Sequence, residues 1–365
     1  MKEYLIEEND SDQRLDRFLK KIFPHIPKNL IYKFNRKNKI KIIQQNSWEN
    51  LSKIWQYNKT IQAKKQHHQY KLQTWDKVQV YLSDTEIKEL SQDIAKKNLY
   101  PLQKNEQLLG DTIIFEDENL LIINKNPWIN VHPWNHKTHE VSLIQQVDDY
   151  YRYDKKLFSM TFKPSLIHRI DRDTSGIIMI AKNKISLTKL INDFKSSSTR
   201  YSLAEWNKKR QNSITKTYYA LVAWKLSRNT WSIKKNILHI KDAMHQNKVQ
   251  ISQKWQTAIT HYKVLKEFYI TTPKGKQVIS GLEITLETGR MHQIRIHLSH
   301  IGNPIIWDKT YGDKQLNAYF IKNYSLYRQM LHAWKITFIH PKTHKKIHIT
   351  ADLKNDMKEF ISKIS

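Results

Sequence analysis

The 365-residue chain has no cysteine and no long hydrophobic run. Without cysteine it cannot form disulfides, cysteine-ligated zinc sites or iron–sulfur clusters, and it has no thiol nucleophile. A membrane-spanning helix needs roughly 18 consecutive apolar residues, and no segment approaches that length. Since these absences fit a reducing compartment, we expect cytoplasmic localisation and no membrane partner.

Acidic residues are also scarce relative to basic ones. Asp and Glu number 34 against 62 Lys and Arg, so the formal net charge is +28. The basic residues are spread along the chain, which favours a polyanionic partner because each neutralised phosphate releases condensed counterions. RNA, DNA and an anionic membrane surface all fit this charge. A hydrophobic content of 39% indicates a globular protein and not a disordered tail.

The first part of the chain has the pattern of a small domain. Residues 11–23 carry apolar side chains spaced i, i+3, i+4 and i+7, which predicts a basic amphipathic helix with Asp12 as its N-cap. A second helical stretch covers 29–34, and alternating residues near 40–42 and 78–82 predict two strands. Together these elements predict a compact helix, helix, strand, strand unit.

The remaining chain predicts a larger domain after a linker. Residues 85–110 mix charge with few apolar positions and are predicted to be the linker. From residue 111 onwards, short apolar or alternating runs of strand length are interrupted by helical stretches such as 187–194. This texture predicts an α+β domain over 111–365 with a mixed or antiparallel sheet, preceded by a first domain over 1–84.

The densest group of reactive side chains is segment 168–176, which reads His-Arg-Ile-Asp-Arg-Asp-Thr-Ser-Gly and precedes an apolar strand. Two carboxylates and two guanidinium groups meet there, and a neighbouring arginine favours the charged form of a carboxylate. An arbitrary segment of this composition is most often a solvated ion-pair loop. The residue types alone therefore leave a reactive site and a solvated loop both open.

The longer string favours the reactive site. Residues 168–181 resemble the H-R-L-D-x-x-T-S-G-L-L-x-x-A motif of the RluA-type pseudouridine synthases, which isomerise uridine in structured RNA. Three further segments are similar to motifs of this family in the same order: 113–133, 216–222 and 288–298. Residues 11–84 separately resemble the ribosomal-protein-S-four-like RNA-binding domain that many members carry. Four ordered motifs make the resemblance specific.

The resemblance implies three catalytic residues. Asp171 would be the nucleophile, attacking either the glycosidic carbon of the sugar or carbon 6 of the uracil. Arg295 would form an ion pair with Asp171, and Tyr218 would pack against the target base. Detaching, turning and reattaching the base involves no net redox change, so we expect no cofactor and no metal.

The resemblance also implies contacts with RNA. Arg169 matches the family arginine that fills the space left when the target uridine is flipped out of its stack. The other expected RNA contacts are Arg172, Arg290 and His292 in the catalytic domain and Arg14, Arg17 and Lys20 in the N-terminal domain. We expect a monomer acting on large-subunit ribosomal RNA. The alternative is a catalytically inactive relative that binds ribosomal RNA as an assembly factor, although the retained Asp171, Tyr218 and Arg295 argue against it.

Glycine is the last scarcity: it occurs 7 times, whereas tryptophan occurs 11 times. Seven tryptophans stand where the family tends to have glycine, namely Trp75, Trp128, Trp134, Trp224, Trp231, Trp255 and Trp307. Such positions often need a positive φ or a close approach of the backbone. We expect several of them to be glycine in the cell, encoded by UGA, which some bacterial lineages read as glycine and a common alternative code reads as tryptophan. The alternative is a divergent enzyme that packs these indoles and bonds their N–H groups.

Overall fold

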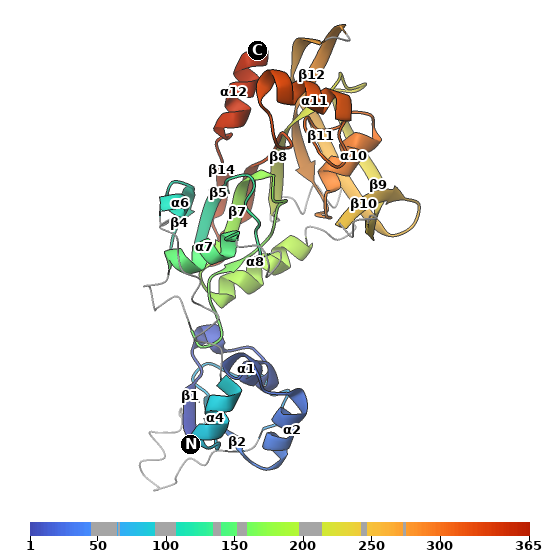
Figure 1. Ribbon diagram of the computed structural model, residues 1–365. Coiled ribbons are helices and arrows are strands. Elements are labelled where there is room, and N and C mark those ends of the chain that lie inside the picture. Colours follow the sequence, from blue (N-terminus) through green and yellow to red (C-terminus); the bar gives the residue numbers. More distant parts are fainter. Residues whose placement is uncertain are drawn as a thin grey trace. The chain divides into compact units, whose positions relative to one another are not determined.

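The structure is a computed structural model that describes residues 1–44, 64, 66–91, 107–133, 140–151, 159–196, 214–241, 247–272 and 275–365 (Figure 1). The chain divides into two compact units. The first unit comprises Met1–Glu106, Asp148–Pro164 and Lys182–Ile185, and the second comprises Gln107–Val147, Ser165–Ala181 and Ser186–Ser365. Two short segments from the region predicted as catalytic domain therefore belong to the first unit. In the described chain, no helix has the length and apolar character needed to cross a membrane.

The first unit packs helices on a three-stranded antiparallel sheet of order β1-β3-β2. Its elements are β1 (Lys2–Leu5), the 3-10 helix η1 (Glu8–Asp10), α1 (Leu15–Ile22), α2 (Lys28–Arg36), β2 (Ile40–Ile43), β3 (Lys77–Val80) and α4 (Asp84–Ser91). The apolar stripe of α1, formed by Leu15, Phe18 and Leu19, is buried in the core of this unit. The two predicted helices and two predicted strands are confirmed.

Two details of this unit differ from the expectations. Helix α1 has Arg14 at its N-cap, not Asp12. Asp12 has a φ of 48° and its N–H donates to the carbonyl of Leu72, so the chain turns before the helix begins. Helix α4 lies in the predicted linker, and its Ile87 is buried in the core of the first unit.

The second unit is built on an 11-stranded sheet of order β10-β9-β11-β12-β8-β13-β7-β5-β4, with β14 paired to β13 and β6 paired to β7. Its strands are β4 (Ile113–Glu116), β5 (Leu120–Lys125), β6 (Ser165–Leu166), β7 (Ser175–Ala181), β8 (Thr215–Ala223), β9 (Thr230–Lys241), β10 (Asn247–Ser252), β11 (Gln256–Thr272), β12 (Gly275–Leu286), β13 (Leu331–Ile339) and β14 (Lys346–Thr350). Neighbouring strands are antiparallel except β13 and β7, which are parallel. The predicted α+β class with a mixed sheet is confirmed.

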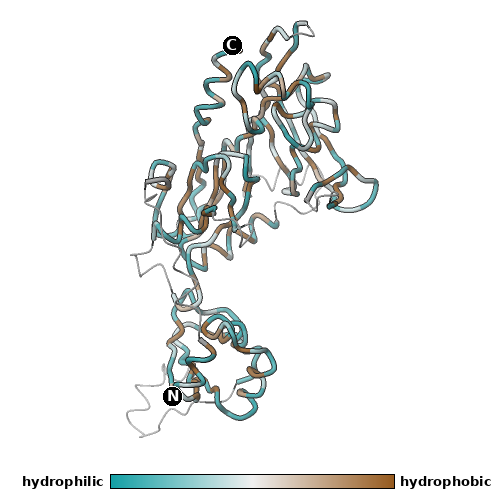
Figure 2. Tube along the Cα trace, viewed as in Figure 1, coloured by the Kyte–Doolittle hydropathy of each residue, from teal (hydrophilic) through white to brown (hydrophobic). Residues whose placement is uncertain are grey.

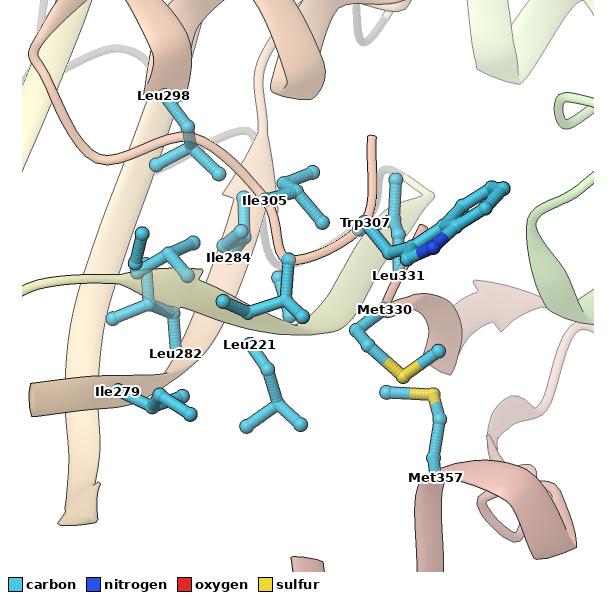
Figure 3. Close-up of a cluster of buried hydrophobic side chains, with 14 of the residues drawn as sticks. Leu221, Ile279, Leu282, Ile284, Leu298, Ile305, Trp307, Met330, Leu331 and Met357 are labelled. Atoms are coloured by element: carbon cyan, nitrogen blue, oxygen red, sulfur yellow. The ribbon is translucent and has the colours of Figure 1, made fainter. Parts of the chain in front are cut away.

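Helices cover the buried strands of this sheet (Figure 1). They are α6 (Gln107–Gly110), α7 (Leu143–Tyr150), α8 (Lys184–Ser196), α10 (Gln293–His300), α11 (Lys314–Tyr324) and α12 (Asn355–Ile364). Every residue of β7 is buried, and Leu190 of α8 packs in the same cluster. Ile294 and Leu298 of α10 pack with β8 and β12 in the largest core cluster, which also includes Met357 of α12 (Figure 3). Figure 2 shows the apolar residues concentrated along the strands inside this unit.

Candidate active site

Asp171 lies in the loop between β6 and β7, and neighbouring elements hold this loop at several points. Lys125 at the end of β5 donates to the carbonyl of Arg172 at 2.9 Å. The hydroxyl of Ser175 bonds to Nδ1 of the buried His332 at 2.8 Å. Gly176 has a φ of 112°, and a Cβ there would lie 2.2 Å from the carbonyl oxygen of Ala333. Only glycine, which has no Cβ, lets β7 approach β13 this closely. The close approach fixes the point at which the loop that carries Asp171 joins β7.

Arg295 reaches this loop from helix α10. Its Nη1 donates to Oδ2 of Asp171 at 3.0 Å, so the predicted ion pair is present. Helix α10 ends at His300 and is followed by Gly302 with a φ of 82°. Burial alone would lower the pKa of Arg295, but the bonds and charges of Asp308 and Asp171 raise it. The guanidinium therefore stays charged.

Asp308 is a site residue that the sequence analysis missed. Its two oxygens accept from Nε and Nη2 of Arg295 at 2.6 and 2.9 Å. The backbone N–H groups of Thr310 and Tyr311 donate to the same carboxylate at 2.8 and 3.0 Å. Burial would raise the pKa of Asp308, but Arg295 and these backbone donors lower it. Asp308 thus fixes one edge of the guanidinium while Asp171 takes the other.

A signal for Asp308 was present in the sequence. A buried guanidinium has five N–H donors, whereas Asp171, whose side chain is 28% exposed, bonds to one of them. The remaining donors need further acceptors, and a second carboxylate can satisfy two of them. Nothing local in the sequence shows that the turn after α10 folds back onto Arg295.

Tyr218 enters the site from β8 through the strand register. Ala333 of β13 pairs with Gly176 on one side and with Tyr218 on the other. This places Tyr218 two strands away from the start of β7, where the Asp171 loop ends. The side chain is buried, and burial together with the charge of Asp171 raises the pKa of Tyr218, so its phenol stays neutral.

His292 lies next to the ion pair. Its Nε2 is 3.9 Å from Oδ2 of Asp171, and its Nδ1 is 3.0 Å from the hydroxyl of Tyr311. Burial lowers the pKa of His292, so the ring is neutral near pH 7. His297 supports the same helix through a 2.9 Å contact between its Nδ1 and the hydroxyl of Thr260. Both histidines therefore support the helix that carries Arg295 by hydrogen bonding.

The other expected RNA-contacting residues are distributed over both units. Arg169 is exposed, and Arg172 is half-exposed and bonds to Asp173 at 3.0 Å. Arg290 is partly buried, and its Nε lacks a hydrogen-bond partner within the described residues. In the first unit, Arg17 and Lys20 are exposed on α1. Arg14 instead forms a two-point ion pair with Asp16 at 3.0 and 2.6 Å.

Comparisons with known proteins agree with this geometry. The family model described as RNA pseudouridylate synthase matches residues 119–300, which include Asp171, Tyr218 and Arg295. "Ribosomal large subunit pseudouridine synthase C" of Buchnera aphidicola subsp. Schizaphis graminum is 33% identical over 359 residues, covering 98% of this chain and 95% of that protein. The Vibrio cholerae protein of the same name is 28% identical over 98% of this chain and 95% of its own length.

A solved structure extends the comparison to the fold. "Human RNA Pseudouridylate Synthase Domain Containing 4" aligns with a TM-score of 0.50 and 20% identity, covering 71% of this chain and 95% of that one. The two chains therefore share a fold. Since the bacterial relative at 33% identity covers nearly the whole chain, the protein belongs to the RNA pseudouridylate synthase family.

Proposed function

We propose that the protein converts uridine to pseudouridine in large-subunit ribosomal RNA, with Asp171 as the nucleophile. The observation that supports this proposal most directly is the Asp171–Arg295 ion pair at 3.0 Å. The buried Asp308 binds the other edge of the Arg295 guanidinium. The names of the bacterial relatives support ribosomal RNA as the substrate. The net charge of +28 fits an RNA partner.

Asp171 has the features that a nucleophile needs. One oxygen, Oδ2, is held by Arg295, while Oδ1 has no hydrogen-bond partner among the described residues. The side chain is partly exposed, so a flipped nucleotide can reach it. In the reaction the bond from C1′ to N1 breaks, a bond from C1′ to carbon 5 forms, the proton on carbon 5 leaves and N1 gains a proton. Arg295 orients Asp171 for the attack through its bond to Oδ2.

Tyr218 is proposed to pack against the target base. Its phenol is neutral because burial and Asp171 raise its pKa, so it presents a flat apolar ring and a hydroxyl and not a phenolate. A neutral ring is a suitable stacking partner for uracil. We further propose that its hydroxyl acts near the carbon 5 proton, and this second role is tested separately below.

Basic residues around the loop are proposed to hold the RNA. Arg169 is proposed to fill the gap left by the flipped uridine, and Arg172, Arg290 and His292 to contact the strand around it. In the first unit we expect Arg17 and Lys20 to bind phosphates more strongly than Arg14, because Arg14 already pairs with Asp16. We further propose that the protein works as a monomer, since one chain supplies both members of the ion pair. We also propose that it acts in the cytoplasm.

The test is the variant Asp171→Asn, with Asp173→Asn as the matched control. Both changes replace a carboxylate in the same loop by an amide, but Asp173 bonds to Arg172 and not to Arg295. We expect Asp171→Asn to abolish pseudouridine formation in ribosomal RNA while RNA binding is retained, and Asp173→Asn to stay active. Substantial activity in pure Asp171→Asn enzyme refutes the nucleophile. A wild-type protein that binds ribosomal RNA but forms no pseudouridine supports the assembly-factor alternative.

A further inference from the structure

Five tryptophans adopt a backbone conformation that suits glycine. The φ angles are 70° at Trp75, 62° at Trp128, 66° at Trp224, 101° at Trp255 and 58° at Trp307. A positive φ is uncommon outside glycine, and for a bulky side chain it is an outlier. The other non-glycine residues with positive φ in the described chain are Asp, Asn, His and Ser. In that part of the protein, every large apolar residue with positive φ is a tryptophan.

The two remaining described tryptophans behave differently. Trp334 lies in β13 at an irregularity of the pairing with β8, and it is not among the residues with positive φ. Its ring contacts Tyr219 edge-on, and Nζ of Lys335 lies 3.5 Å from the ring centroid. Trp231 lies in β9 and packs against Arg228. Its extended backbone gives no support to the expectation that it replaces glycine. Trp134 lies outside the described residues.

Turn geometry explains why the conformation is required at Trp75 and Trp307. The N–H of Asp76 donates to the carbonyl of Gln73, so Trp75 is the third residue of a four-residue turn. In the same way, the N–H of Asp308 donates to the carbonyl of Ile305, which makes Trp307 the third residue of its turn. A positive φ at the third position is the mark of a type II turn, and that position calls for glycine.

The other three positions are also constrained by their surroundings. Trp128 lies in a turn that Lys125 closes by donating from Nζ to the carbonyls of Asn126 and Ile129. Trp224 follows β8, and its N–H and carbonyl bond to Val278 and Ser280 of β12. Trp255 lies in the three-residue connection between β10 and β11. At Trp128 and Trp224 the bonds that shape the backbone do not involve the indole.

The indoles gain little at these positions. Trp75, Trp128, Trp224 and Trp255 are exposed, the last of them by 68%. Trp307 is buried, but its Nε1 has no hydrogen-bond partner in the part of the chain that the structure describes. Figure 3 shows its ring extending from the edge of the core cluster, away from Leu298 and Ile284. Buried indoles normally bond their N–H. Four of the five indoles lack burial and Trp307 lacks the N–H bond, so none of them shows both expected signs of a selected tryptophan.

We propose that residues 75, 128, 224, 255 and 307 are glycine in the protein made by its own cell, and that their codons are UGA read as glycine. The shared feature is the backbone conformation, which a single change in decoding explains at all five positions at once. Position 307 links this proposal to the site, because the next residue, Asp308, holds Arg295. The turn that carries Asp308 would then contain the residue its geometry requires.

The decisive experiment identifies these residues in protein isolated from the native cell. Peptide mass spectrometry and the coding DNA are read at the five positions, with Trp334 as the internal control. We expect UGA and glycine at the five positions, and UGG and tryptophan at 334. Tryptophan in the five peptides overturns the proposal whichever codon is present, and so do UGG codons there.

A second measurement uses the chain with the printed sequence. Trp75→Gly, Trp128→Gly and Trp255→Gly, all at exposed positions, are compared with Trp334→Gly by thermal unfolding. We expect the first three changes to raise the midpoint, because glycine removes the strain of a positive φ. The control is expected to lower it, because it removes a ring with partners from a strand. A fall in the midpoint at all three test positions contradicts the proposal.

Discussion

Replacing Asp308 with asparagine removes the carboxylate that aligns Arg295 beside Asp171. The Asp308 oxygens accept from Nε and Nη2 of Arg295 at 2.6 and 2.9 Å. An amide of the same shape has one acceptor oxygen, so its NH₂ group faces one of the two donors. Altering one partner of a buried ion pair typically costs about 3–5 kcal/mol. Because Arg295 keeps its bond to Asp171, we place Asp308→Asn near the lower limit, at about 3 kcal/mol of unfolding free energy.

The effect on catalysis follows from the displaced guanidinium. A shift of ~1 Å in a reacting constellation costs roughly 100-fold in rate, and we expect kcat to fall by about that factor. The KM for RNA should change little, because Asp308 is 1% exposed and does not reach the substrate. Turnover is measured by release of tritium from RNA labelled at carbon 5 of uracil. Asp352→Asn is the matched control, since this carboxylate is exposed and pairs with Lys358 only at 3.6 Å.

Two results would refute the reasoning about Asp308. One is a folded Asp308→Asn enzyme whose kcat lies within about twofold of wild type. The other is a defect confined to KM. The double variant with Arg295→Lys gives a further check, because two residues that act through one contact have non-additive effects. If the effects of the two single variants simply add in the double variant, Asp308 does not act through its contact with Arg295.

Three further predictions concern the base, the pH dependence and the RNA. Tyr218→Phe should reduce turnover more than RNA affinity if the phenol has a chemical role, and equal turnover would leave Tyr218 only as a stacking surface. Burial lowers the pKa of His332 to about 4, below the ordinary value near 6.5. As the pH falls, this histidine is therefore protonated in the unfolded chain before it is protonated in the folded protein. The free energy of unfolding decreases as the pH drops from about 6.5 to about 4, by roughly 3 kcal/mol from this residue. Urea unfolding at pH 7 and 5 should show a shallower loss in His332→Asn, and an identical loss would contradict the assignment. Arg17→Gln and Lys20→Gln should each weaken RNA binding and flatten its salt dependence. Arg14→Gln should do so less, because Arg14 is already paired with Asp16. Equal slopes of RNA affinity against salt concentration in the three variants would count against this ranking.

Local elements were predictable where one face of a segment is apolar. The stripe of Leu15, Phe18 and Leu19 has helical period, and α1 buries it. Strand β1 was missed because its four residues are mostly exposed and show no alternation. Helix α4 was missed although Ser83 and Glu86 form a capping box, in which each side chain bonds to the other residue's backbone N–H. Low hydrophobicity outweighed that signal.

The chemical character of the site was predictable, but the contacts between residues far apart in the sequence were not. The motif around Asp171 and a buried-edge Arg295 together call for an ion pair, because a buried guanidinium needs a carboxylate. The second carboxylate, Asp308, depends on how the turn after α10 folds back. The contact between Ser175 and His332 joins residues 157 positions apart. It exists because β7 and β13 lie parallel and adjacent, and no local pattern encodes which strands become neighbours.

The sequence by itself determined the charge, the absence of thiol chemistry, the family motif around Asp171 and the excess of tryptophan over glycine. These are properties of residue types and their spacing, and they persist in any conformation. Tertiary structure decided the partners of Arg295, the neutral state of Tyr218 and the left-handed φ at Trp307. These depend on burial and on strand register, which arise only when distant segments pack together.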